Sequence, residues 1–372
     1  MELSITGFAN SGKTTLFNAI TGAGIETSAL ITNEAKPIFR NVDVPDSRID
    51  YLSGLFKPQK TTYTNIKYID FIGFIKGDTK RNRAIIDLIK DSDAIVNVVR
   101  AFESGAVVHP LESVDYLRDI ILFESELILM DLELVENRLN RIQEGEKKGK
   151  RGNPREVEIL MKCHNILSDD IPLREVDFSS DELIDMRHLQ FASIKPELIV
   201  INTDENSSKE EMTEITERVK SEFIKNRRNI EVITLCAKIE SEIAQLQPDE
   251  RALFLREMNI DKPALSKLIE SSYNLLDVIS FITVGEDEVR AWSIRKGSSA
   301  QQAAGRIHSD IEQGFIRAEV VSYSDFVRMV EEFGGRLPPD YVGELKSKHR
   351  LRLENKDYIV NDGDIINFRH AR

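Results

Sequence analysis

The chain has 372 residues, of which 63 are acidic and 50 are basic, so its formal net charge is −13. A chain this acidic is not a general binder of polyanions, although a local basic patch remains compatible with it. The two cysteines, Cys163 and Cys236, are too few for a disulfide framework, and we expect reduced thiols of a cytoplasmic protein. We expect no signal peptide and no membrane span. The length predicts two or three domains.

The residues from Gly7 to Thr15 fit the phosphate-binding P-loop pattern G-x-x-x-x-G-K-[ST]. A strand predicted at 3–6 precedes them, and an amphipathic helix predicted at 14–21 follows. Consecutive backbone N–H groups and a helix N-terminus then point at one place, which is a cradle for phosphates. We expect Lys13 to neutralise the outer phosphates and Thr14 to hold Mg²⁺. The predicted nucleotide contacts in this loop are Asn10, Ser11, Gly12, Lys13, Thr14 and Thr15.

A second motif, Asp70-Phe71-Ile72-Gly73, follows a predicted strand. In nucleotide switches this D-x-x-G segment places its Asp near Mg²⁺ and its Gly N–H near the γ-phosphate, so we assign these roles to Asp70 and Gly73. Phe74 stands where many GTPases have a Gln that orients the attacking water, which Phe cannot do. Lys13 and Phe74 are the two residues that we assign to the catalytic positions.

The first switch loop is expected between residues 22 and 40, where the sequence has little periodicity. Spacing does not choose among the candidates for a Mg²⁺ contact there, which are Thr27, Thr32 and Glu34. A helix predicted at 81–91 and a buried strand predicted at 94–99 continue the alternation of strands and helices. This alternation predicts an α/β fold with a parallel sheet.

A long helix is predicted from 111 to 142, because apolar residues recur there at the spacing of a coiled-coil seam. These residues are Ile121, Ile128, Leu132, Val135, Leu139 and Ile142. A return helix is predicted from Pro154, with Asn153 as N-cap and Glu156 as capping partner. It offers to the same seam Val157, Leu160, His164 and Leu167. The tip of this hairpin is either a solvated turn or a contact for an RNA backbone, because it carries Lys147, Lys148, Lys150, Arg151 and Arg155.

The sheet is expected to resume at 197–201, followed by Asn202-Thr203-Asp204-Glu205. Guanine-nucleotide proteins carry N-K-x-D here, so Thr203 replaces the Lys that lies along the base and Glu205 replaces the Asp with a longer arm. Guanine recognition is therefore weakened. A further strand predicted at 231–235 leads into the loop that covers the base. The expected contacts with the base are Asn202, Thr203, Glu205, Cys236 and Ala237.

The remaining chain changes character near residue 280. Helices are predicted at 239–246, 249–258 and 263–273. After them the strand-like segments are 278–284, 289–294, 318–322 and 364–368. Strands with few helices between them predict a separate small α+β domain.

These motifs make the chain resemble the Obg-like ATPase family, also called YchF, over nearly its whole length. The segments that carry the resemblance include 7–15, 70–77, 126–133, 202–205, 288–294, 302–308, 314–320 and 357–364. The family implies a P-loop NTPase domain with an inserted helical coiled coil, and a small β-grasp-like TGS domain. On that pattern, the P-loop domain is formed by 1–112 and 193–279, the coiled-coil domain by 113–192, and the TGS domain by 280–372.

The resemblance also implies a function. It implies slow hydrolysis of ATP, bound at least as well as GTP, and association with ribosomes or RNA through the hairpin tip and the TGS domain. It implies Mg²⁺, and also K⁺ at Asn10, whose alternative role is that of a plain loop amide.

The chain departs from the family pattern in its switch segments. Ile72 replaces a small Ala, Asp78–Arg83 replaces a glycine-rich run, and the first switch has no clear Thr. We therefore expect secure nucleotide binding with impaired switching and hydrolysis. Two alternatives stay open: a GTPase with an altered base loop, and a nucleotide-binding scaffold without turnover.

Overall fold

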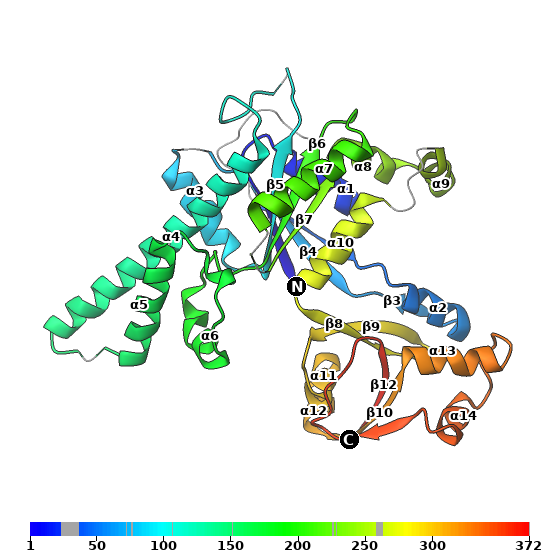
Figure 1. Ribbon diagram of the computed structural model, residues 1–372. Helices are drawn as coiled ribbons and strands as arrows, with labels where there is room; N and C mark the ends of the chain where they lie inside the picture. Colours follow the sequence, from blue (N-terminus) through cyan, green and yellow to red (C-terminus); the bar gives the residue numbers. More distant parts are fainter. Residues whose placement is uncertain are drawn as a thin grey trace. The chain divides into compact units, whose positions relative to one another are not determined.

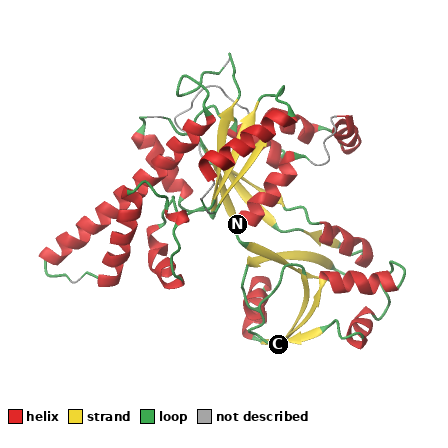
Figure 2. Cartoon of the chain, viewed as in Figure 1, coloured by secondary structure: helices red, strands yellow, loops and turns green. Residues whose placement is uncertain are grey.

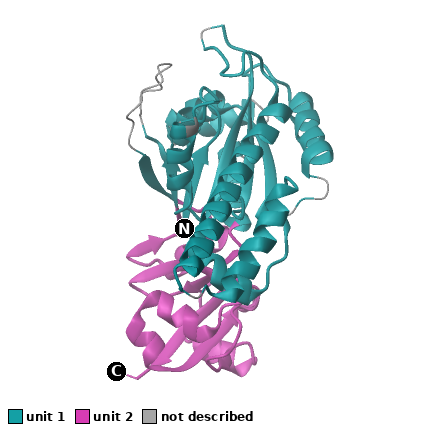
Figure 3. Cartoon of the chain, turned by 90° about the vertical axis from the view of Figure 1, so that its left-hand side faces the viewer, with its two compact units in different colours: residues 1–42, 67–275 teal, residues 43–66, 276–372 magenta. Residues whose placement is uncertain are grey.

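The computed structural model describes residues 1–23, 37–71, 73–75, 77–105, 107–150, 152–224, 227, 229–257 and 263–371. It divides into two compact units (Figure 3). The first consists of residues 1–42 and 67–275, and the second of residues 43–66 and 276–372. The division differs from the expected domain pattern, because 43–66 groups with the C-terminal segment.

The first unit is built on a six-stranded sheet of order β2-β4-β1-β5-β6-β7 (Figure 1). Parallel pairing joins β4, β1, β5, β6 and β7, which confirms the predicted α/β fold. Because parallel strands end at one edge of a sheet, the loops after β1, β4 and β6 are expected to meet there. The strands are β1 Glu2–Thr6, β2 Ile38–Asp43, β4 Asn65–Asp70, β5 Ala94–Ala101, β6 Glu197–Thr203 and β7 Ile230–Leu235.

Helices accompany this sheet (Figure 2). They agree in place with the predicted ones, with ends shifted by a few residues, except for the helix at 209–219, which was not predicted. Strands β5 and β6 are buried almost throughout, because side chains pack on both faces of the sheet. The helices are α1 Lys13–Thr21, α3 Thr79–Ile89, α7 Lys209–Val219, α8 Ala237–Gln245, α9 Pro248–Glu257 and α10 Ala264–Leu275, with a π-helical turn at Lys220–Ile224.

The predicted helical hairpin is formed by α4 Tyr116–Lys147 and α5 Pro154–Ser168. Helix α4 begins after the predicted residue 111, because the Asp115 carboxylate caps it by accepting from the Arg118 N–H. Asn153 caps α5 as predicted. The capping role predicted for Glu156 is wrong, since its carboxylate accepts from Arg138 of α4 at 2.7 Å.

The hairpin core contains most of the predicted seam, together with the free thiol of Cys163. Ile128, Val135, Leu160 and Leu167 are buried there. Ile121 is 52% exposed, so its predicted place in the seam is wrong. Helix α5 has 15 residues against 32 in α4, so it covers only part of the longer helix. Three short helices follow: Leu173–Glu175, α6 Ser180–Met186 and Arg187–Leu189.

A buried ionic cluster ties the base of the hairpin to the sheet. Arg174 is fully buried and contacts the carboxylates of Glu124 on α4 and Glu197 on β6, the latter at 3.1 Å. Glu197 also accepts from the Asn97 amide of β5 at 2.9 Å. Burial and the neighbouring Glu124 together raise the pKa of Glu197 to about 8, against the opposing attraction of Arg174. Removing Arg174 would break its buried contacts with both Glu124 and Glu197, so the cluster fixes the hairpin base.

The second unit is a mixed six-stranded sheet of order β11-β10-β12-β8-β9-β3. Its strands are β3 Lys60–Thr62, β8 Val278–Thr283, β9 Glu288–Arg295, β10 Phe315–Ser322, β11 Arg352–Glu354 and β12 Asp364–His370. Its helices are α2 Ser47–Phe56, α11 Ala300–Ile307, α12 Ser309–Gln313, α13 Tyr323–Glu332 and α14 Tyr341–Ser347. Within the described part of the chain, no helix is long and apolar enough to cross a membrane.

Residues 43–66 belong to this unit through strand pairing and side-chain packing that their sequence did not predict. Strand β3 lies parallel to β9, and the buried side chains of Ile49 and Leu52 on α2 belong to the same core as Phe326. Arg48 also forms ion pairs with Asp46 and with Asp362. The segment is therefore an integral part of the second unit.

Candidate functional site

The loop between β1 and α1 approaches the neighbouring strands so closely that only glycine fits at two positions. Gly7 and Gly12 have φ angles of 131° and 94°. A Cβ on Gly7 would lie 2.3 Å from the carbonyl oxygen of Val98, and one on Gly12 would lie 2.2 Å from Nδ2 of Asn202. The loop therefore lies against β5 and β6, and it leads directly into the N-terminus of α1. This is the anion-binding arrangement that the motif predicts.

Lys13 is the first residue of α1 and is 6% exposed. Its Nζ donates to the carbonyl oxygen of Phe8 at 2.7 Å, which holds the amine over the loop. Burial lowers the pKa of Lys13 to about 8, against the attraction of Asp70. A bound phosphate would raise this pKa again by supplying negative charge beside the amine.

Thr14 and Asp70 form the oxygen-rich side of the site. The Thr14 hydroxyl donates to Oδ2 of Asp70 at 2.9 Å, while Oδ1 of Asp70 is buried and has no protein partner. Burial raises the pKa of Asp70, opposed by Lys13. A buried carboxylate oxygen without a partner next to a hydroxyl suits a hard cation such as Mg²⁺. The described residues contain no cluster of three or more His, Cys, Asp or Glu side chains that could hold a metal by itself.

The segment that follows Asp70, which we call the second switch and of which the structure describes residues 73–75, is bound to the P-loop through its backbone. The Phe74 N–H donates to the Gly7 carbonyl and the Ala9 N–H donates to the Phe74 carbonyl, each at 2.9 Å. A Cβ on Gly73 would lie 2.6 Å from the backbone nitrogen of Ala9, so only glycine permits this approach. The Phe74 side chain is fully buried and packs edge-to-face on Phe123 of α4, with 5.2 Å between ring centroids. Phe74 therefore contributes backbone to the site and its ring to the core.

Asn202 joins the P-loop to the loop that follows β7. Its Nδ2 donates to the Ser11 carbonyl, and its Oδ1 accepts from the Ala237 N–H, each at 2.9 Å. Thr203 is buried, and its hydroxyl donates to the Leu235 carbonyl at 3.3 Å. The Thr203 side chain is thus directed into the sheet and cannot lie along a base.

The remaining base-loop residues, Glu205 and Cys236, lie at or beside the start of α8. The Glu205 carboxylate pairs with the ammonium group of Lys238, and both side chains are exposed. Cys236 is the buried N-cap residue of α8, and burial raises the pKa of its thiol. A thiol with a raised pKa is unreactive at neutral pH.

The predicted site residues thus separate into two groups. The structure brings together Asn10, Ser11, Gly12, Lys13, Thr14, Asp70, Gly73, Asn202 and Ala237. The side chains of Phe74, Thr203 and Glu205 make contacts away from the loop. Thr15 lies in the first turn of α1. The first-switch candidates Thr27, Thr32 and Glu34 lie outside the described residues, as do Ile72 and Arg151.

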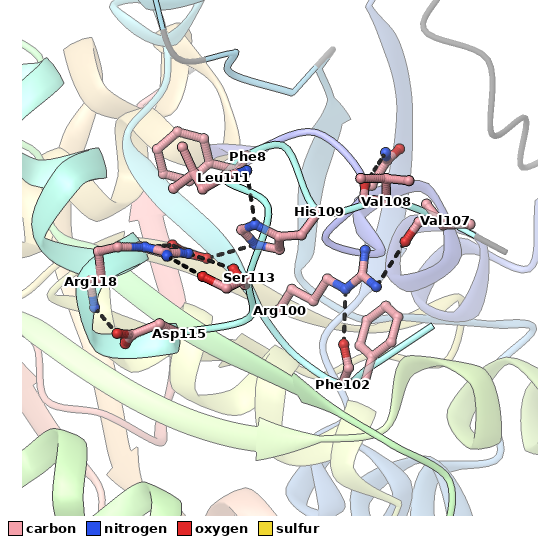
Figure 4. A network of polar contacts seen from close by, with 12 residues as sticks. Phe8, Arg100, Phe102, Val107, Val108, His109, Leu111, Ser113, Asp115 and Arg118 are labelled. Carbon is pink, nitrogen blue, oxygen red and sulfur yellow. Dashed lines mark hydrogen bonds and ion pairs between the residues drawn. The ribbon is translucent and has the colours of Figure 1, made fainter. Parts of the chain in front are cut away.

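The segment after β5 also lies at the P-loop, which its sequence did not indicate (Figure 4). The Asn10 amide donates to the Val108 carbonyl at 3.1 Å. Arg100 is buried at the end of β5 and donates to the carbonyl groups of Phe102 and Val107. One buried guanidinium group therefore shapes the turn that meets the phosphate loop. A charged residue near the end of a mostly apolar strand was the available signal.

A buried His–Asp pair fastens the same segment to α4 (Figure 4). Nε2 of His109 lies 2.9 Å from Oδ2 of Asp119, and Nδ1 of His109 accepts from the Leu111 N–H at 3.1 Å. Arg118 donates to Asp119 and to Ser113. Burial lowers the pKa of His109, opposed by the attraction of Asp119. The segment is thus anchored at both ends, by Arg100 and by this pair.

Comparison with known proteins agrees with this geometry. The sequence profile MMR_HSR1, described as "50S ribosome-binding GTPase", matches residues 2–130. The profile YchF-GTPase_C, described as "Protein of unknown function (DUF933)", matches residues 278–371. The "Ribosome-binding ATPase YchF" of Bacillus subtilis is 39% identical over 99% of both chains. The protein of the same name from Escherichia coli O157:H7 is 36% identical over 99% of this chain and 98% of its own.

A solved structure shows the same fold. The YchF GTPase of Schizosaccharomyces pombe superposes with a TM-score of 0.78 at 27% identity, and the alignment covers 99% of this chain and 97% of that one. Likeness in sequence and in fold therefore extends over both units and the helical hairpin. The chain belongs to the YchF family.

Proposed function

We propose that the protein binds and slowly hydrolyses ATP, and that it accepts GTP no better than ATP. The observation that carries this proposal is the base loop. The Asn202 amide is hydrogen-bonded to the backbone of Ser11 and Ala237. The Thr203 side chain points into the sheet, and Glu205 is paired with Lys238. None of these side chains supplies the Lys and Asp contacts that favour guanine. Relatives named "Ribosome-binding ATPase" support the same choice.

The chemistry of the site follows from its own residues. The P-loop N–H groups and the N-terminus of α1 would bind the phosphate chain, and Lys13 would neutralise it. Thr14 and Asp70 would hold Mg²⁺, which supplies Lewis-acid stabilisation of the phosphate charge when it is bound. The Gly73 N–H would contact the γ-phosphate. The buried Phe74 ring cannot orient water, so turnover is slow.

We also propose ribosome association for this chain, in the cytoplasm, because curated relatives bear ribosome-binding names. The basic tip of the hairpin is the surface that we assign to RNA, together with residues 280–372 as a TGS domain. Residues 113–192 act in this proposal as an inserted helical domain, and 1–112 with 193–279 as the P-loop domain, apart from residues 43–66, which belong to the second unit. K⁺ at Asn10 belongs to the same proposal, since the Asn10 side chain lies between the P-loop and Val108.

A GTPase is the second candidate. It is favoured by the solved Schizosaccharomyces pombe relative, which is described as a GTPase, and by the GTPase profile that matches the first part of the chain. The third candidate is a nucleotide-binding scaffold without turnover, which the altered switch segment favours.

Titration of the full-length chain with ATP, GTP and their diphosphates separates the first two candidates. Turnover with Mg²⁺ and K⁺, with and without ribosomes, separates both from the scaffold. We expect ATP to bind at least as tightly as GTP and to be hydrolysed slowly. Much tighter GTP binding would favour the GTPase, and binding without turnover under every condition would favour the scaffold. Lys13→Ala is the control, and unchanged ATP affinity in it would refute the phosphate site.

A further inference from the structure

The buried side-chain amide of Asn82 on α3 binds the backbone of Ile75 in the second switch. Asn82 is 2% exposed. Its Oδ1 accepts from the Ile75 N–H at 3.1 Å, and its Nδ2 donates to the Ile75 carbonyl at 3.0 Å. Both polar groups of one backbone residue are thus satisfied by one side chain. Such a closed pair fixes the position of Ile75 much as a neighbouring strand would.

The residues before Ile75 are held by the phosphate loop itself. Phe74 exchanges backbone hydrogen bonds with Gly7 and Ala9 across the P-loop, and Gly73 packs against Ala9 and Lys13. Three consecutive residues, 73–75, therefore have their backbone set by the P-loop at one end and by Asn82 at the other. A displacement of the Gly73 backbone must therefore change both the contacts with the P-loop and the hydrogen bonds between Ile75 and Asn82.

The same amide reaches the hairpin. Nδ2 of Asn82 lies 3.3 Å from Oε2 of Glu126 on α4, and Arg83 in the next position forms an ion pair with Glu133 on α4. Phe74 adds an apolar link through its contact with Phe123. Helix α4 is therefore connected to α3 by a hydrogen bond and an ion pair, and to Phe74 by an aromatic contact.

The aromatic link between Phe74 and Phe123 lies in a core that cannot absorb a displacement locally. Phe74 and Phe123 belong to one buried cluster with Phe8 of the P-loop and with Ile85 and Ile86 of α3. Closely packed interiors change between discrete arrangements rather than deform continuously. A shift of the Gly73 backbone on gain or loss of the γ-phosphate therefore requires α4 to repack.

We propose that Asn82 is a positioning residue that couples the γ-phosphate sensor at Gly73 to the hairpin helix α4. Asn82 does not touch the nucleotide. It holds Ile75, and through Ile75 the Gly73 N–H, in register with α4, so that the hairpin differs between the triphosphate and diphosphate states. The proposal rests on the proposed nucleotide site, and not on the identity of the base.

Hydrogen–deuterium exchange of the full-length chain tests it. Exchange in α4 is compared between Mg²⁺ with a non-hydrolysable ATP analogue and Mg²⁺ with ADP, in the wild type and in Asn82→Ala. We expect the wild type to show a difference between the two states in the part of α4 that includes Phe123, Glu126 and Glu133, and Asn82→Ala to lose it. We also expect kcat to fall about tenfold while KM changes less than about twofold.

Two further variants make the test decisive. Glu126→Ala breaks the 3.3 Å link to α4 but leaves the Ile75 pair intact, so it should reduce the exchange difference even where Asn82→Ala does not fold. Leu160→Ala disturbs the buried hairpin core away from the switch, and it should keep the difference between nucleotide states. The proposal is overturned if the wild type shows no difference in α4, or if Asn82→Ala and Glu126→Ala both retain it. Absence of ATP turnover in the wild type would instead refute the proposed function, since the exchange measurement needs no hydrolysis.

Discussion

Replacing Lys13 by Met should stabilise the nucleotide-free protein while it abolishes nucleotide binding. Burial lowers the pKa of Lys13 from 10.5 to about 8. At about 1.4 kcal/mol per pKa unit, this shift corresponds to about 3 kcal/mol of destabilisation at neutral pH. Met removes the buried charge, but it also removes the hydrogen bond to Phe8, and losing that bond costs about 1 kcal/mol of stability. We therefore expect a net gain of about 2 kcal/mol in the free energy of unfolding.

The pH dependence gives this prediction its sign. Below pH 8 the lysine is protonated in both the folded and the unfolded chain, so the folded state carries the full cost of the buried charge. Between pH 8 and pH 10.5 the folded lysine loses its proton while the unfolded one keeps it, so the stability of the wild type rises with pH. The advantage of Lys13→Met is therefore complete below pH 8 and disappears as the pH approaches 10.5.

Urea unfolding of the nucleotide-free chain at pH 7 and pH 9.5 measures this difference. Circular dichroism is the suitable signal, because the single tryptophan, Trp292, lies in the second unit. Lys150→Met, at the exposed hairpin tip, controls for the loss of one lysine. A variant less stable than the wild type at pH 7, or a difference that does not shrink with pH, would refute the reasoning.

Three further predictions concern the base loop, the metal site and the buried cluster, and a fourth concerns the hairpin tip. Thr203→Lys with Glu205→Asp should raise the affinity for GTP relative to ATP by about tenfold in a competition titration, because it restores both guanine contacts; an unchanged ratio would count against this account of the loop. Asp70→Asn should weaken nucleotide binding in Mg²⁺ but not in EDTA, and equal loss in both would exclude a metal role. Arg174→Met should lower the free energy of unfolding by about 3–5 kcal/mol in urea titrations, since it removes the buried cation that contacts both Glu124 and Glu197, while Arg227 still pairs with Glu124; a stable variant would contradict it. Ribosome binding should weaken and lose its salt dependence when serine replaces Lys147, Lys148, Lys150, Arg151 and Arg155. Unchanged ribosome binding at every salt concentration would show that the tip is only a solvated turn.

Local sequence predicted those elements whose signal lies within a few residues. The P-loop motif, the strand before it, the helix after it and the two helices of the hairpin all carry such a signal, because phosphate binding needs glycines at fixed positions and because buried faces impose a period. The same is true of Asp70, Gly73 and Asn202, which end predicted strands of one parallel sheet. Parallel strands bring their carboxyl ends to one edge, so these residues meet without further information.

Contacts between distant segments could not be obtained in this way. Residues 43–66 join the second unit because β3 pairs with β9 and α2 packs on Phe326, and neither contact has a local signature. Ile121 fits the seam by spacing, yet it is exposed because α5 is shorter than α4. Its position depends on where a partner helix ends.

The sequence by itself predicted the phosphate loop and the elements that carry a local signal, because each rests on residue type and spacing along the chain. Only the tertiary structure decided what Phe74 and Asn82 do. Phe74 departs from the Gln of many GTPases, but its burial against Phe123 shows that the position now belongs to the core. Asn82 was one polar residue near the start of a predicted helix until the fold placed its amide on both polar groups of Ile75. A buried amide acquires its role from the partners that satisfy it, and those partners are set by packing rather than by sequence distance.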